Sequence, residues 1–106
     1  MKRGDLVTVA VSGDYGKPRP ALVVQADAFD LHPSVIVLPL TSEVHDAPLF
    51  RVTVAADAAT GLRVPSQIMV DKATAVPRVK LGARIGEVDG ATMQFVDKAL
   101  RGFLGL

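Results

Sequence analysis

The first residues that could do chemistry form a short basic stretch near the N-terminus. Residues 13–20 read GDYGKPRP and set Lys17 and Arg19 among glycines and prolines. Each proline fixes its own φ, and the residue before a proline is held in extended conformations, so the backbone of Arg19 is restricted. The stretch is either a solvated basic loop or a rigid holder for an anion, since a guanidinium matches phosphate oxygens in charge and shape.

Hydroxyl and carboxylate groups follow two apolar segments further along the chain. Thr41 and Ser42 come directly after the segment VIVLPL, and Asp71 comes directly after SQIMV. A hydroxyl at the end of a strand can donate to a phosphate oxygen, although it can equally satisfy a local turn. Asp71 could accept a proton as a general base or could cap a turn.

The two histidines, His32 and His45, are the remaining candidates for proton transfer near neutral pH. Both fall in predicted loops, and we favour their interpretation as surface residues. The chain has no cysteine, and its histidines have no cluster of carboxylates at ligand spacing. We therefore predict no metal site and no cofactor.

Short strands separated by turn residues must position these groups, and a helix follows them. The predicted strands are residues 5–11, 21–26, 35–40, 49–54, 66–70 and 83–88. Asp89 is a candidate N-cap for a helix that starts near Gly90. The apolar face of that helix consists of Met93, Val96, Leu100, Phe103 and Leu104. This order predicts a mainly β fold, a small antiparallel β-barrel with a C-terminal helix packed on it.

Two details of these elements carry further expectations. Pro39 predicts that its strand is a sheet edge or contains a bulge, since proline has no N–H to donate. Phe95 lies off the apolar stripe of the helix and could reach a second copy of the chain.

Composition limits the class of protein. We treat residues 1–106 as one domain, because 106 residues with 49% apolar side chains and a mean hydropathy of +0.33 suffice for one packed core. A net charge of +1 is too small for a protein that coats duplex DNA, although a local basic groove remains possible. No apolar run has the roughly 18 residues that a membrane span needs, and we expect a cytoplasmic protein without a membrane partner.

Several motifs in this order resemble the MazF/PemK (Kid) toxins of bacterial toxin–antitoxin modules. The strongest matches are RPALVV at residues 19–24 and VLPLTS at residues 37–42, followed by SQIMVDKATAV, RIGEVD and the terminal ALRGFLGL. The resemblance implies an SH3-like β-barrel with a C-terminal helix, shared with the CcdB fold, and a homodimer. It also implies sequence-specific, metal-independent cleavage of single-stranded RNA, usually mRNA, at short sequences, and a MazE/PemI-like antitoxin whose tail occupies the RNA site.

Catalytic roles follow from the resemblance together with the chemistry of RNA cleavage. When the 2′-hydroxyl attacks the adjacent phosphorus, the intermediate gains negative charge that must be stabilised. Arg19 stands where the family has a functional arginine, and Thr41 stands at its functional threonine. We expect Arg19 to hold the scissile phosphate, Thr41 to donate to it, and Asp71 to act as the general base.

The sequence departs from the Kid branch at one point. Relatives there carry Arg-x-Asp at this strand end, whereas this chain has Met69, Val70 and Asp71. Either Asp71 acts with Arg19 alone, or the reaction depends mainly on stabilisation of the phosphate. The candidate RNA-binding residues are Tyr15, Lys17, Ser42, His45, Gln67 and Lys72. Tyr15 could stack on a base, and Gln67, like Ser66, could read one.

Two other functions remain alternatives. A non-enzymatic DNA gyrase poison of the CcdB type would share the fold, but it needs neither the RPALVV nor the VLPLTS motif. A plain SH3-like module would need an aromatic groove, which one tyrosine and four phenylalanines without tryptophan can hardly build.

Overall fold

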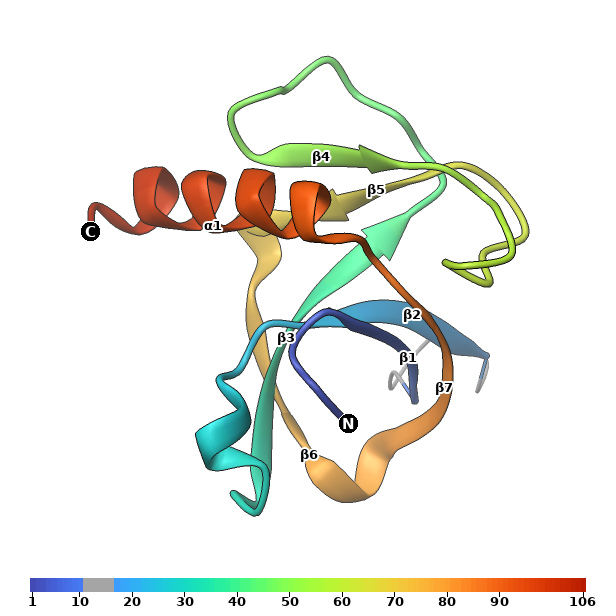
Figure 1. The fold of residues 1–106 in the computed structure, drawn as a ribbon, viewed down its shortest axis with the longest axis vertical. Helices are drawn as coiled ribbons and strands as arrows, with labels where there is room; N and C mark the ends of the chain where they lie inside the picture. The colour runs from blue at the N-terminus through green and yellow to red at the C-terminus, as the bar shows by residue number, and fades with distance from the viewer. Residues whose placement is uncertain (11–16) are drawn as a thin grey trace.

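The computed structural model describes residues 1–10 and 17–106, which form a strongly curved antiparallel sheet and one long C-terminal helix (Figure 1). The strands are β1 (Asp5–Ala10), β2 (Pro18–Val23), β3 (Ser34–Thr41), β4 (Arg51–Val54), β5 (Ser66–Met69), β6 (Thr74–Pro77) and β7 (Leu81–Glu87). The helices are α1 (Gly90–Leu104) and the short 3-10 turns η1 (Asp27–Phe29), η2 (Val70–Lys72) and η3 (Arg78–Lys80).

Strand β3 is the centre of the sheet. It pairs with β2 along one edge, and along the other edge first with β6 and then with β5. Of the two alternatives predicted for Pro39, its placement in an edge strand is therefore wrong. Strand β6 pairs only as far as Val37 and β5 begins at Leu40, so Pro39 lies in the gap between the two partners. A residue without an N–H fits such a gap in an otherwise central strand.

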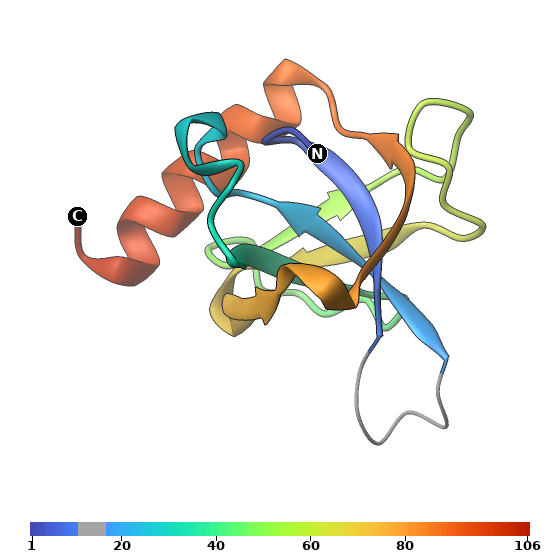
Figure 2. The same cartoon turned by 90° about the horizontal axis from the view of Figure 1, so that it is seen from below.

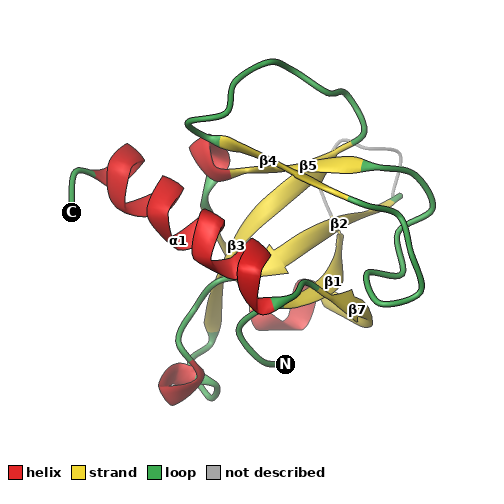
Figure 3. Ribbon diagram, turned by 45° about the horizontal axis from the view of Figure 1, so that its top comes forward, coloured by secondary structure: helices red, strands yellow, loops and turns green. Residues whose placement is uncertain are grey.

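Both faces of β1, β2 and β3 are apolar, because their side chains alternate between two clusters. Leu6, Leu22 and Leu38 are neighbours across the three strands, and all three are fully buried. They share one cluster with Ile68 of β5 and Val96 of α1. The opposite cluster contains Val7, Val9, Ala21, Val23, Val35, Val37 and Val76. Figure 2 and Figure 3 show that α1 lies on one side of the curved sheet.

The C-terminal helix has the ends that the sequence predicts. The Asp89 carboxylate accepts a hydrogen bond from the Thr92 N–H at 2.7 Å. Hydrogen bonding from the Thr92 side chain, and then from this N–H, holds the pKa of Asp89 below its ordinary value. Gly105 closes the helix in the left-handed region. Two expected core residues differ, since Phe103 is 52% exposed and Leu104 is exposed as well. Phe103 still contacts the ring of Phe50, with 6.0 Å between the centroids.

Several strand boundaries differ from the sequence prediction, and one strand was missed. The strand β2 begins at Pro18, so Arg19 lies in a strand and not in the preceding loop. Strand β6 was not predicted, since TAVP is short and ends in proline. Strand β7 starts at Leu81, before the predicted residue 83. Within the described residues, no helix is long and apolar enough to cross a membrane.

A tight turn fastens the loop between β4 and β5 onto β7. Gly61 has a φ of +68°, and the Gly61 N–H donates to the Asp57 carbonyl at 2.9 Å. A methyl group added to Gly61 would lie only 1.9 Å from the Ile85 carbonyl oxygen. The turn therefore depends on glycine for its conformation and for the close approach of β7.

Replacing this glycine is expected to destabilise the fold. Gly61→Ala should cost about 2–3 kcal/mol, because it combines a strained φ with a clash against backbone. That cost corresponds to a loss of about 10 °C or more in Tm, measured by thermal unfolding. Gly102→Ala is the matched control, since Gly102 is helical and has open space around it, and it should keep or raise the Tm. Equal Tm values for both variants would contradict this account.

Candidate functional site

The polar candidates share one face of the sheet, because strand register places them side by side. In the β2–β3 pairing Val23 faces Val37 and Ala21 faces Pro39, and Arg19 and Thr41 each lie two residues beyond this last pair, on the same face of their strands. Thr41 in turn faces Gln67 of β5, and Gln67 faces Thr53 of β4. Cross-strand partners point to the same face. A polar row thus continues the face that carries Val37 and Val23 in the core.

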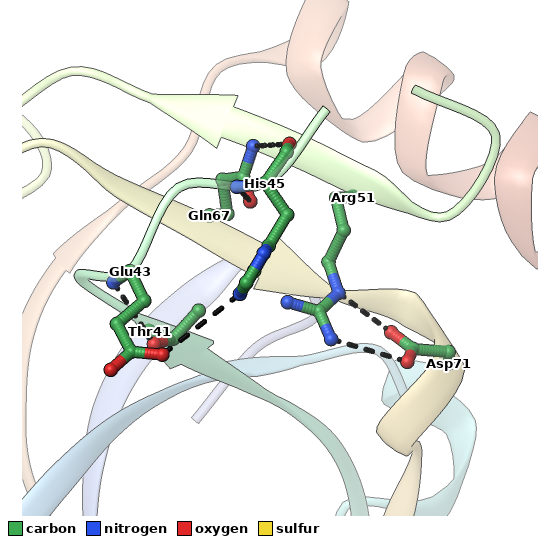
Figure 4. A network of polar contacts seen from close by, with 6 residues as sticks. All are labelled: Thr41, Glu43, His45, Arg51, Gln67 and Asp71. Carbon is green, nitrogen blue, oxygen red and sulfur yellow. Dashed lines mark hydrogen bonds and ion pairs between the residues drawn. The ribbon is translucent and has the colours of Figure 1, made fainter. Parts of the chain in front are cut away.

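At the end of this row Arg51 and Asp71 form a two-pronged ion pair (Figure 4). Arg51 Nε donates to Asp71 Oδ1 at 2.9 Å, and Arg51 Nη2 donates to Asp71 Oδ2 at 3.3 Å. Only 11% of the Arg51 side chain and 18% of the Asp71 side chain are exposed. Each charge is partly removed from water, and the pair satisfies both groups in a fixed relative orientation.

This pair argues against the predicted role of Asp71 as the general base. The hydrogen bond from Arg51 holds the pKa of Asp71 below its ordinary value, against the opposing effect of burial. A carboxylate with a lowered pKa and with both oxygens engaged is a weak proton acceptor at neutral pH. The geometry instead gives Asp71 the task of orienting the Arg51 guanidinium.

The sequence analysis did not single out Arg51, although it belongs to this site. It lies on β4 directly opposite Met69 of β5, the position at which the Kid-branch arginine is missing. The sequence contained one signal that could have pointed to Arg51. Strand alternation in RVTV puts Arg51 and Thr53 on one face and Val52 and Val54 on the other. Only the pairing of β4 with β5 brings that face next to Asp71.

Gln67 is a structural residue, and its predicted role in reading bases does not fit its contacts. Its side chain is buried, and it accepts from the His45 N–H and donates to the His45 carbonyl, both at 2.9 Å. Its amide nitrogen also donates to Thr53 Oγ1 at 3.3 Å. These bonds fasten the loop of residues 43–48 to the sheet in the manner of a strand pairing. Ser66 is likewise buried and donates to the Val64 carbonyl.

The loop of residues 43–48, which Gln67 holds in place, forms one wall of a pocket of about 480 Å³ that is open to solvent. Residues 44–48 form its loop wall, and Arg51, Thr53 and Gln67 contribute from the strands. The imidazole of His45 is exposed, and its Nε2 lies 3.9 Å from a carboxylate oxygen of Glu43. No group of three or more metal-ligating side chains occurs among residues 1–10 and 17–106.

Thr41 has the turn contact that its sequence allowed, and it keeps a free donor. Its Oγ1 accepts from the Glu43 N–H at 3.1 Å, which leaves the hydroxyl hydrogen for another acceptor. Ser42, the neighbouring hydroxyl, is exposed. Lys17 and Lys72 are exposed as well, the latter in η2. Tyr15 lies outside the described residues. The His32 imidazole contacts the backbone of Ser34, and the His32 carbonyl accepts from Arg78.

Comparison with known proteins gives consistent matches over the whole chain. The family described as PemK-like, MazF-like toxin of type II toxin–antitoxin system matches residues 2–104. A probable endoribonuclease MazF from Mycolicibacterium smegmatis is 47% identical over 107 residues, which cover 100% of this chain and 98% of that protein.

Solved structures show the same fold. An endoribonuclease in complex with its cognate antitoxin from a mycobacterial species has a TM-score of 0.82 and 26% identity, and the match covers 100% of this chain and 96% of the other. The Mycobacterium tuberculosis toxin MazF-mt6 has a TM-score of 0.83 at 24% identity, and the match covers 96% and 97% of the two chains.

The ion pair predicts a specific dependence of stability on pH. Because the pKa of Asp71 is lowered by folding, its stabilising effect is present above about pH 4 and is lost as pH falls through the folded value. Asp71→Asn should lower the free energy of unfolding by about 2 kcal/mol at pH 7. Urea unfolding between pH 7 and pH 2.5 should show this difference from the wild type shrinking in acid.

The exposed carboxylate of Asp30 provides the control for this experiment, since no ion pair holds it in the described part of the chain. Asp30→Asn should unfold like the wild type at pH 7. A difference between Asp71→Asn and the wild type that stayed constant down to pH 2.5 would contradict the assigned pKa direction.

Proposed function

The chain belongs to the PemK-like, MazF-like family of type II toxins and is an endoribonuclease toxin, and we propose that it cuts single-stranded RNA by attack of the 2′-hydroxyl on the adjacent phosphorus. The family match and the close relative favour this function over the gyrase poison. The observation that supports the mechanism is that Arg19 and Thr41 each lie two residues beyond the last β2–β3 pair, at the same end of one sheet face.

The reaction proceeds by in-line displacement without a metal. The 2′-oxygen forms a bond to phosphorus as its proton leaves, the bond to the 5′-oxygen breaks, and that oxygen takes up a proton. The products are a 2′,3′-cyclic phosphate and a 5′-hydroxyl end. The barrier lies in the extra negative charge on the non-bridging oxygens of the pentavalent intermediate, which fixed positive and hydrogen-bonding groups stabilise.

Arg19 and Thr41 carry that stabilisation in our proposal. The guanidinium of Arg19 is permanently charged and extends from a strand whose backbone two prolines restrict. The Thr41 hydroxyl has its lone pair engaged by the Glu43 N–H, so its hydrogen is available to a phosphate oxygen. Since Asp71 is held by Arg51, the reaction depends on phosphate stabilisation more than on a carboxylate base.

We also propose an antitoxin partner, a homodimer and action in the cytoplasm, where mRNA is translated. Relatives with the same fold have been solved with a cognate antitoxin, and an antitoxin tail that covers Arg19 and Thr41 would block the RNA site. The exposed apolar side chains of Phe95, Phe103 and Leu106 on or beside α1 suit a surface that a second copy covers. Lys17, Ser42, His45 and Lys72 are exposed and remain candidate RNA contacts.

The two proposed phosphate-stabilising residues should be needed for turnover. Arg19→Ala is expected to lower kcat about 10²- to 10³-fold, and Thr41→Val somewhat less, since each removes a donor used in the transition state. The measurement is the single-turnover rate on a cleaved RNA, with the Tm confirming folding. Lys98→Ala on the exposed face of α1 is the control and should retain the wild-type rate. An Arg19→Ala rate within threefold of the wild type would refute the assignment.

The chemistry itself should require the 2′-hydroxyl and no metal. In buffer with EDTA, a mixed RNA should be cut to fragments with 5′-hydroxyl ends, which a kinase labels without prior phosphatase treatment. A single 2′-deoxy nucleotide on the 5′ side of the cleaved bond should abolish cutting there. Inhibition of gyrase supercoiling without any RNA cleavage would instead support the gyrase-poison alternative.

A further inference from the structure

One donor in the pocket has no partner. Arg51 uses Nε and Nη2 for Asp71, but its Nη1 is buried and makes no hydrogen bond within the described residues. Figure 4 shows this nitrogen on the side of the guanidinium that faces away from Asp71, toward His45. A buried N–H group without an acceptor is costly, and such a group in a native protein calls for an explanation. A ligand acceptor at this place would supply one.

Thr53 adds a second donor on the same face. Its Oγ1 already accepts from the Gln67 amide at 3.3 Å, so the hydroxyl hydrogen is left to donate. Arg51 and Thr53 are alternate residues of β4, and both line the pocket. Gln67 has no spare N–H, because its amide nitrogen is shared between the His45 carbonyl and Thr53. The strand side of the pocket therefore offers donors from Arg51 and Thr53.

The charge of the pocket favours a neutral ligand over a phosphate. The Arg51 guanidinium is compensated by Asp71 at hydrogen-bond distance, so the pair is formally neutral. Asp46 on the exposed loop wall adds a negative charge, which further disfavours an anion. Val44, Ala47 and Pro48 provide apolar surface against which a flat group can lie. A volume of about 480 Å³ accommodates an RNA base.

We propose that this pocket is a subsite for one RNA base that carries a keto oxygen, guanine or uracil, with Arg51 Nη1 and the Thr53 hydroxyl as the donors that recognise it. The inference rests on the proposed RNA-cleaving function and adds the reading of a base to it. Guanine presents two acceptors, O6 and N7, and uracil presents O4, whereas adenine and cytosine place an amino group at the corresponding position. An amino group there would face donors and leave them unpaired.

The proposed subsite requires access to Arg51 Nη1, and the His45 side chain lies on that side of the guanidinium (Figure 4). The imidazole is 59% exposed, and its recorded side-chain contact is the 3.9 Å approach to Glu43, which exceeds hydrogen-bond distance. The backbone of His45, by contrast, is fixed by the two bonds to Gln67. A rotation of this side chain with the loop backbone in place is the movement that our proposal requires for access to Arg51 Nη1.

The test compares RNAs that differ by one base. The preferred cleavage sequence of the wild type is first mapped by sequencing the ends of cut transcripts, and each position is then varied through all four bases. At one position, guanine or uracil should exceed adenine and cytosine by about 10-fold or more in kcat/KM. Arg51→Lys, which keeps a cation for Asp71, and Thr53→Val should each reduce that preference to about threefold or less. The other positions should keep their preferences.

Binding gives a second readout that does not depend on cleavage. Single-stranded deoxyoligonucleotides of the same sequences, with deoxyuridine for uridine, lack the 2′-hydroxyl and cannot be cut. Their affinity by fluorescence anisotropy should show the same base preference in the wild type and its loss in Arg51→Lys. If no RNA is cut but this binding preference is present, the proposed function fails and the subsite stands.

Three results would overturn the subsite. The wild type could prefer adenine or cytosine at every read position, or both variants could keep the full keto preference while folded. A variant could also lower the affinity for all RNAs by the same factor, which would show that the residue contacts the RNA backbone and not a base. Thr53→Val covers the case in which Arg51→Lys does not fold, since Thr53 is exposed and its loss leaves the ion pair intact.

Discussion

The pairing of β3 with three other strands is the constraint on which this structure depends. Strand β3 places Val35 and Val37 on one face, and Leu38 and Leu40 on the other face with α1. Its last residue, Thr41, belongs to the polar row. A slip of one residue would exchange the two faces, placing Thr41 on the leucine-lined face and the leucines in the valine cluster. The apolar clusters on both faces thus fix the register, and the register fixes the site. The stability of the core and the geometry of the chemistry are therefore set by the same pairing.

The arrangement of charge within the site is as informative as the charges themselves. The chain has a net charge of only +1, and one of its arginines in this region is compensated by Asp71. Arg19 at the other end of the row extends from an exposed part of β2. In our proposal the two ends of the row differ, since Arg19 contacts a phosphate and Arg51 contacts a neutral base. An RNA strand needs both kinds of contact, since phosphates position it and bases specify it.

Loop 43–48 shows how a buried polar side chain can build a binding surface. The Gln67 amide bonds both backbone groups of His45, so the loop gains hydrogen bonds equivalent to one step of a sheet ladder. The loop side chains remain exposed and can differ without loss of this attachment.

Six of the seven strands in the described residues and the capped helix from Gly90 could be predicted from the sequence, because they follow from local periodicity and short patterns. The RPALVV and VLPLTS motifs pointed to Arg19 and Thr41 through the resemblance to the toxin family. The sequence did not reveal β6, the central place of β3 or the contacts of Gln67. It also left Asp71 as a candidate base and passed over Arg51. Those features arise where segments 20 or more residues apart become neighbours, as in the Arg51–Asp71 pair. Hydrogen bonding and the pKa of a side chain depend on such neighbours, and only the tertiary structure decides which neighbours a residue has.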